Sequence, residues 1–170
     1  GNVPASGISA AALAAEGLAD AGRWLALAGG SPGLAIELAA ERLTEVRREL
    51  DALAIARHAQ QEYGGLPLLL SGFSFGAYVQ ARAAQHLHPH PHRLVLIAPA
   101  VGRFAMPPVR HDTLLVHGEL DDVVPLADVL EWSRPLHLPI VVLPEAEHFF
   151  HGRLNQLKQI VLHAFNGQPI

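Results

Sequence analysis

Short apolar runs alternate with helical patterns along the chain from about residue 67 onward. The runs are Leu68–Leu70, Leu94–Ile97, Thr113–Val116 and Ile140–Leu143. They alternate little between polar and apolar positions, which is typical of strands covered on both faces of a parallel sheet. The helical patterns cover residues 76–87, 126–134 and 152–165. Strand alternating with helix predicts an α/β fold with a doubly wound, mostly parallel sheet.

The first 66 residues have a different pattern. They hold 17 alanines and only six β-branched residues, a mixture that favours helix and leaves little material for strands. We expect helices over 9–20 and 22–28, a break at Gly29–Gly33, and a further helix from about Leu34. We therefore divide the chain into a helical N-terminal segment, 1–45, and an α/β domain, 46–170.

The helix that starts near Leu34 has an amphipathic pattern over its second half. Its apolar stripe would consist of Leu43, Val46, Leu50 and Leu53, spaced by three and four residues. Its exposed side would carry Arg47, Arg48, Glu49 and Asp51.

Composition and charge narrow the class of protein. The 170 residues are 50% hydrophobic and 16% charged, which excludes wholesale disorder. A formal net charge of −4 gives no general attraction to nucleic acid or to anionic membranes. The absence of cysteine excludes disulfides, cysteine-based zinc sites and thiol nucleophiles. The first cation is Arg23, which is not typical of a signal peptide, and we expect a cytoplasmic protein.

The sharpest motif is Gly72-Phe73-Ser74-Phe75-Gly76, which follows an apolar run and precedes a helical pattern. The two glycines of a G-x-S-x-G turn allow a strained backbone with the serine hydroxyl exposed at its apex. Ser74 is therefore the candidate nucleophile. The amide of Phe75, at the start of the following helix, is the candidate oxyanion-hole donor.

A nucleophilic serine needs a base, and the base needs an acid to orient it. In chains with this turn the acid comes next and the histidine last, each on a loop after a strand. The order Ser74, Asp121, His148 fits, with separations of 47 and 27 residues.

Neighbouring residues offer alternatives for two of these roles. Glu119 and Asp122 lie on the same predicted loop as Asp121, but adjacent side chains diverge, so only one can face the imidazole. His151 could replace His148 as the base; otherwise it lies on the rim or caps the last helix. We expect a structural role for His117, and packing roles for the side chains of Phe75 and Tyr78.

Three stretches resemble motifs of the small, lidless bacterial α/β-hydrolases related to dienelactone hydrolases and carboxylesterases. They read G-F-S-F-G-A-Y-V, H-G-E-L-D-D-V-V-P and E-H-F-F-H-G-R-L, and the resemblance covers residues 46–165. It implies that Asp121 is the triad acid and His148 the base. It further implies a serine hydrolase that cleaves small carboxylic esters through an acyl-enzyme and needs no cofactor. Only residues 99–112 separate two predicted strands at the usual place of a lid, so we expect an open site.

The chain departs from the family upstream of Ser74, where the family builds three or more strands and a loop with the second oxyanion donor. We therefore expect a truncated sheet, with the strand before Ser74 at an exposed edge and an incomplete oxyanion hole. Such an edge favours self-association. The alternative function is a non-catalytic hydrolase-like remnant, or an interaction module whose helical N-terminus binds a partner.

The histidine-rich stretch His86–His92 is a weak candidate for a metal site. Its alternation with proline predicts an extended segment in which His88, His90 and His92 point the same way. No carboxylate lies within the stretch, and we place it at the end of the sheet opposite the catalytic loops. We expect adventitious nickel or zinc binding there and no biological metal.

Overall fold

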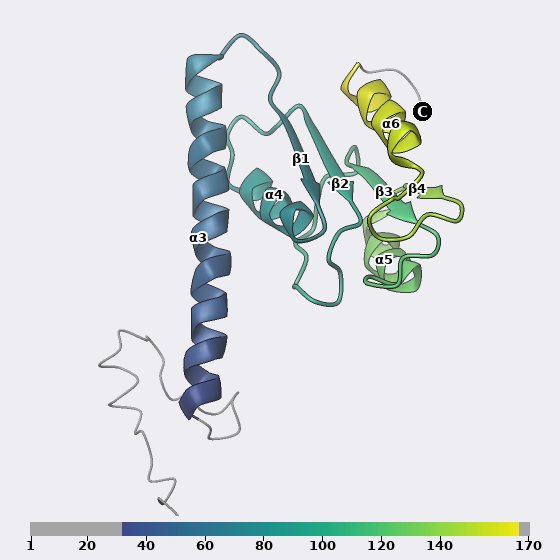
Figure 1. The fold of residues 1–170 in the computed structure, drawn as a ribbon. Coiled ribbons are helices and arrows are strands. Elements are labelled where there is room, and N and C mark those ends of the chain that lie inside the picture. Colours follow the sequence, from purple (N-terminus) through teal and green to yellow (C-terminus); the bar gives the residue numbers. More distant parts are fainter. Residues whose placement is uncertain (1–31, 167–170) are drawn as a thin grey trace, which may run out of the picture. The chain divides into compact units, whose positions relative to one another are not determined.

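The computed structural model describes residues 32–166, so the predicted helices over 9–20 and 22–28 lie outside the described residues. The chain divides into two compact units, residues 1–48 and 49–170. The described helices are α3 (Pro32–Glu62), α4 (Phe75–Gln85), α5 (Leu126–Ser133) and α6 (Leu154–Phe165), with a 3-10 turn at Arg134–Leu136. The strands are β1 (Leu69–Phe73), β2 (Arg93–Ile97), β3 (Leu114–Gly118) and β4 (Ile140–Leu143) (Figure 1).

The four strands form one parallel sheet in the order β1-β2-β3-β4. Every residue of β3 is buried, as expected of a central strand covered on both sides. All four predicted strands are present, with limits within three residues of those expected. The structure thus confirms the predicted class, a parallel α/β sheet with flanking helices.

Alternate residues of the strands point to opposite faces of the sheet and pack in two separate hydrophobic cores. On one face, Leu94 and Leu96 of β2 pack in a cluster with residues of α4 and α5. On the other face, Val95 packs in a cluster with Phe150 and with residues of α6. The sheet is therefore doubly covered, which is why its strands are apolar without alternation.

The predicted apolar stripe on α3 is confirmed only at Leu53, which packs against the core. Leu50 is 60% exposed and Val46 is 39% exposed, whereas Glu49, expected on the wet face, is partly buried. The Glu49 carboxylate accepts a 2.6 Å hydrogen bond from the Tyr78 hydroxyl and pairs with Arg82 at 3.3 Å. These polar partners on α4 turn Glu49 inward, and the apolar contact of α3 with the core is made by Ala56 and Leu53.

Two features of the sheet bear on the site. Among the described residues, β1 pairs with β2 alone, so its other edge has no strand partner within 32–166. The connection between β2 and β3, described throughout, contains one isolated bridge between Val101 and Phe104 and no helix. No helix among the described residues is long and apolar enough to cross a bilayer.

Candidate active site

Ser74 occupies a sharp turn between the end of β1 and the start of α4. Its φ of 52° and ψ of −117° are unusual for a residue with a side chain, and such strain is concentrated at functional turns. The Ser74 amide donates to the Ile97 carbonyl at 2.9 Å, which ties the turn to β2. Phe75 is the first residue of α4, so its amide lies at the N-terminus of that helix.

The two glycines of the turn are not equivalent. A Cβ on Gly72 would lie 2.3 Å from the Gly76 carbonyl oxygen, whereas a Cβ on Gly76 would meet nothing within 4 Å. Gly72 is therefore required because the first turn of α4 folds back against the end of β1.

Asp121 lies in the loop after β3 and is only 6% exposed. One carboxylate oxygen, Oδ1, accepts hydrogen bonds from the amides of Val123 and Val124 at 3.0 and 2.8 Å. The other, Oδ2, lies 2.8 Å from Nδ1 of His148. The backbone of its own loop thus orients the carboxylate toward the imidazole.

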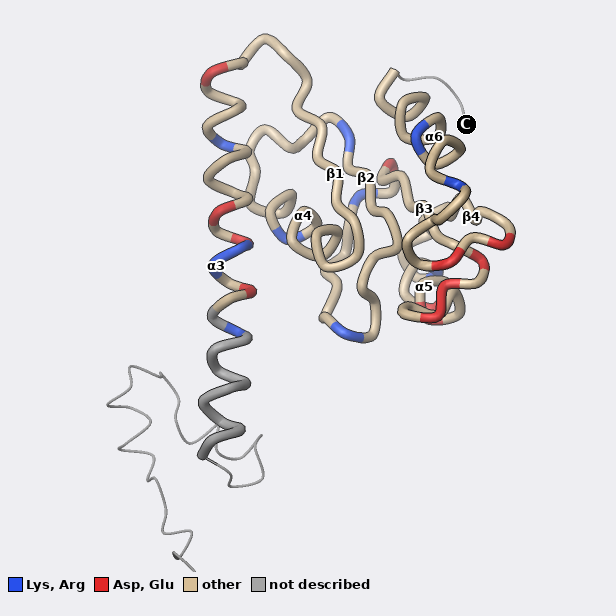
Figure 2. The backbone as a smooth tube through the Cα atoms, in the orientation of Figure 1, with Lys and Arg blue, Asp and Glu red and all other residues tan. Residues whose placement is uncertain are grey.

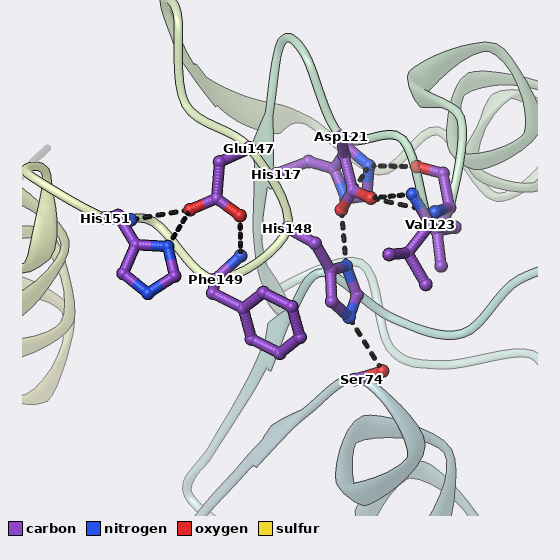
Figure 3. A network of polar contacts seen from close by, with 9 residues as sticks. Ser74, His117, Asp121, Val123, Glu147, His148, Phe149 and His151 are labelled. Carbon is purple, nitrogen blue, oxygen red and sulfur yellow. Dashed lines mark hydrogen bonds and ion pairs between the residues drawn. The ribbon is translucent and has the colours of Figure 1, made fainter.

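His148 lies in the loop after β4 and is 3% exposed. Its Nε2 lies 3.1 Å from the Ser74 hydroxyl oxygen, so the three side chains form one line from Asp121 through His148 to Ser74 (Figure 3). With Nδ1–H donating to the carboxylate, Nε2 carries a lone pair and accepts from the serine hydroxyl. This tautomer is the one that a general base needs.

The alternative residues lie elsewhere. Asp122 is exposed, and the Glu119 carboxylate accepts a hydrogen bond from the Glu145 amide at 2.9 Å. The side chain of His151 is 78% exposed and pairs with Glu147 at 2.8 Å. The structure therefore brings together Ser74, Asp121 and His148 and none of these alternatives. Of the two positions expected for His151, the rim and the cap of the last helix, it takes the rim, and Arg153 is the residue that precedes α6.

His117 has the structural position that was expected. Its Nε2 donates to the Val124 carbonyl at 2.9 Å and lies 3.5 Å from Asp121 Oδ2. Burial lowers the pKa of His117 below its ordinary value, against the opposing effect of its bond to Val124. The ring is neutral near pH 7 and ties the end of β3 to the loop that carries Asp121.

The sequence reasoning missed the role of Glu147. Its carboxylate accepts hydrogen bonds from the amides of Phe149 and His151 at 2.9 and 2.7 Å, and these bonds lower the pKa of Glu147. Both amides follow His148, so these bonds organise the turn that the chain makes directly after the histidine (Figure 3). An acidic side chain directly before the histidine was the available signal, because such groups often accept from amides a few residues ahead.

Aromatic rings border the histidine. The ring centroids of Phe73 and Phe149 lie 5.0 and 5.1 Å from that of His148, and these phenyl groups are 39% and 55% exposed. In contrast, Phe75 packs against Phe104 with centroids 4.9 Å apart, and Tyr78 is buried. Phe75 and Tyr78 thus have the expected packing roles, whereas Phe73 and Phe149 present apolar surface beside the nucleophile.

The rim of the site is acidic. Figure 2 shows acidic residues gathered in the loops that follow β3 and β4. They include Glu119, Asp122, Glu145 and Glu147. Arg153 pairs with Glu145 at 2.7 Å, which leaves the rim with an excess of negative charge.

No cluster of three or more histidine, aspartate or glutamate residues within the described part of the chain is arranged to hold an ion. In the histidine-rich stretch, the rings of His88 and His90 lie 5.2 Å apart, and both residues are exposed.

Solved structures of bacterial α/β-hydrolases resemble the fold of this chain. A lidless α/β serine hydrolase from Xanthomonas campestris is 32% identical over 72% of this chain and 57% of its own, with a TM-score of 0.64. An α/β serine hydrolase homologue from Coxiella burnetii is 31% identical over 65% of this chain and 54% of its own, with a TM-score of 0.57. No protein-family model and no curated protein matches the sequence.

The chain spans little more than half the length of these two structures. A third structure, a hydrolase of the α/β superfamily from Xanthomonas campestris, is 22% identical with a TM-score of 0.57 and supports the fold alone. The resemblance to small, lidless bacterial α/β-hydrolases that the three motifs predict is confirmed for the fold.

Proposed function

We propose that this chain, which has the fold of the bacterial α/β serine hydrolases, is a serine esterase that cleaves small or soluble carboxylic esters. The observation that carries the proposal is the continuous line of contacts from Asp121 through His148 to Ser74, at 2.8 and 3.1 Å. Side chains from three separate loops meet there, and two of the three are almost fully buried.

The proposed reaction has two steps. The Ser74 hydroxyl oxygen attacks the ester carbonyl carbon while His148 Nε2 takes the hydroxyl proton, and the imidazolium then protonates the departing alcohol. Water attacks the acyl-enzyme with the same base, which releases the acid and restores Ser74. Asp121 holds the imidazole and stabilises its cation, and no cofactor takes part.

The developing oxyanion would receive a hydrogen bond from the amide of Phe75 at the start of α4. Within residues 32–166 no strand precedes β1, and we assign no second donor from this part of the chain. Loss of one oxyanion donor typically costs about 10²–10³ in turnover. We therefore expect an enzyme that reacts with active-site probes but turns over slowly.

The surroundings of Ser74 favour neutral, apolar esters. Phe73 and Phe149 offer exposed rings beside His148, whereas the acidic rim repels anionic substrates. The short connection between β2 and β3 supports an open site. Esters of short fatty acids should react faster than esters that carry a free carboxylate.

Labelling with a fluorophosphonate probe tests the proposal. Wild-type protein should be labelled, Ser74→Ala should not, and the variant should keep the fold because Ser74 is partly exposed. Ser74→Ala, His148→Ala and the double variant should lose ester hydrolysis to the same extent, because triad members act as a unit. Additive losses would contradict a shared mechanism.

A matched pair of variants separates the acid from its neighbour. Asp121→Asn should reduce hydrolysis of p-nitrophenyl butyrate steeply, whereas Asp122→Asn, one residue along and exposed, should leave it unchanged.

Absence of labelling in folded wild-type protein would favour the non-catalytic alternative, an interaction module. This alternative is the second candidate because α3 and the turn after it expose large apolar side chains that a partner could cover. They are Leu50, Ile55 and Tyr63.

We also propose that the open edge of β1 supports self-association, since unpaired strand edges pair readily. Sedimentation velocity across a concentration series tests this. Ser71 is an exposed residue of β1, and Ser71→Pro should reduce association because it removes an amide from this edge strand. A monomer at all concentrations would refute the proposal.

A further inference from the structure

Acyl transfer to Ser74 fixes where each half of an ester has to lie. In the tetrahedral intermediate the reacting carbon carries the Ser74 oxygen, the oxyanion, the alcohol oxygen and the acyl chain. The oxyanion is directed at the Phe75 amide. The alcohol oxygen must come within hydrogen-bond reach of His148 Nε2, which protonates it, and the acyl chain takes the remaining direction. Side chains that border His148 therefore meet the alcohol half of the ester.

Two phenyl rings border His148, and we call them the aromatic pair: Phe73, at the end of β1, and Phe149, directly after His148. Their centroids lie 5.0 and 5.1 Å from that of the imidazole and 6.1 Å from each other, distances typical of favourable aromatic contacts. The Phe149 ring lies beside the imidazole with the two planes at 85° (Figure 3). Because the pair is partly exposed, a further ring can pack on it next to Nε2.

Other aromatic rings close to Ser74 in the sequence make their contacts within the protein. Phe75 and Tyr78 both pack against Phe104, with centroids 4.9 and 5.0 Å away, and Tyr78 is buried. These rings hold α4 against the connection between β2 and β3. The aromatic pair differs from them because its exposed surface lies beside the catalytic base.

The turn after His148 holds Phe149 in place. The Phe149 amide donates to the Glu147 carboxylate at 2.9 Å, and the same carboxylate accepts from the His151 amide at 2.7 Å. A ring on an ordered turn loses less conformational entropy when a ligand packs on it. The negative charge of Glu147, whose pKa these bonds lower, disfavours an alcohol that carries an anionic group.

We propose that the aromatic pair recognises the alcohol half of the substrate and that the preferred substrates are esters whose neutral alcohol carries an aromatic ring. The proposal rests on the proposed esterase function and specifies which half of the ester bears the ring. When the bond between the carbonyl carbon and the alcohol oxygen breaks, its electron pair stays on that oxygen, which takes the proton from His148 Nε2. The aromatic alcohol then leaves from the pair, and the acyl group stays on Ser74.

Two isomeric esters test this assignment. Benzyl propionate carries its ring on the alcohol, whereas ethyl phenylacetate has the same formula and carries its ring on the acid. For each ester, kcat/KM compares the free enzyme and ester with the transition state of acylation, in which the alcohol is still present. We define the selectivity as kcat/KM for benzyl propionate divided by kcat/KM for ethyl phenylacetate. Comparing it between variants of the full chain cancels the intrinsic reactivities of the two esters.

Phe149→Ala should lower the selectivity about three- to tenfold, the effect expected of one aromatic contact. Phe73→Leu, which removes the other ring and keeps an apolar side chain, should lower it as well. Leu162→Ala truncates a partly exposed apolar residue on α6 and should keep the wild-type selectivity. Damage to the triad slows both esters alike, so a fall in selectivity reports the ring contact.

The possible failures are distinguishable. If the wild type hydrolyses both esters and Phe149→Ala keeps its selectivity, the assignment of the aromatic pair is overturned and the esterase function stands. A rise in selectivity would place the pair against the acyl half and would overturn the assignment equally. If folded wild-type protein neither hydrolyses these esters nor reacts with the fluorophosphonate probe, the esterase function itself is refuted, and the assignment with it.

Discussion

Replacing either glycine of the serine turn with alanine adds the same methyl group within one five-residue motif, yet the two variants should behave oppositely. In Gly72→Ala the new Cβ would lie 2.3 Å from the Gly76 carbonyl oxygen, 2.4 Å from its carbonyl carbon and 2.6 Å from the Ala77 nitrogen. In Gly76→Ala it would have no neighbour within 4 Å. The sequence motif alone treats these glycines alike.

The magnitude follows from the overlap. Ordinary contacts of a Cβ begin at 3.4 Å, so the first turn of α4 would have to move by about 1 Å, since every obstructing atom is backbone. Overpacking of this kind costs about 1–3 kcal/mol of unfolding free energy. The movement would also break the contact between the Ser74 hydroxyl and His148 Nε2, which are 3.1 Å apart. Lengthening this distance by about half an ångström places the two atoms beyond hydrogen-bond range. Gly76→Ala should instead stabilise α4 by up to about 1 kcal/mol.

Urea unfolding followed by circular dichroism measures the unfolding free energy of each variant. Fluorophosphonate labelling measures the reactivity of Ser74, which depends on its contact with His148. We expect Gly72→Ala to unfold at lower urea concentration and to lose labelling, while Gly76→Ala keeps both. Equal unfolding free energies for the two variants would show that α4 does not approach β1 closely at Gly72, and the argument from the turn would fail.

Three further perturbations test the surroundings of the triad. Gly118→Ala would place a Cβ 2.5 Å from the Ala146 carbonyl oxygen and push apart the loops that carry Asp121 and His148. We expect the unfolding free energy measured in urea to fall by about 1–3 kcal/mol and probe labelling to slow by at least about tenfold. Unchanged labelling would contradict this prediction. Burial lowers the pKa of His117, so the unfolded chain binds more protons as the pH falls through about 6.5 and the folded state loses stability. His117→Gln should flatten this decline between pH 7.5 and 5.5, and an equal slope in both proteins would exclude His117 as its cause. Phe149→Ala should raise KM for p-nitrophenyl butyrate about three- to tenfold with little change in kcat, as loss of an apolar contact predicts. Leu162→Ala, a similarly exposed apolar truncation on α6, is the control and should leave KM unchanged.

Much of this protein is determined by patterns local in the sequence. The apolar runs predict all four strands, since continuous apolar residues are stable only where both faces of a strand are covered. The motif around Ser74 predicts a strand-to-helix turn because few sequences tolerate its backbone. The chain order of serine, acid and histidine, taken together with the resemblance of the three motifs to a known family, selected Ser74, Asp121 and His148, which the fold brings together.

Only the tertiary structure determines how segments that are distant in the sequence contact one another. The inward face of α3 could not be read from its apolar spacing, because Tyr78 and Arg82, on another helix, supply partners that draw Glu49 inward. The inequality of Gly72 and Gly76 was likewise hidden, since it depends on how closely α4 returns to β1. A local pattern records which residues avoid water, whereas the partner that each residue meets is set by packing across the whole domain.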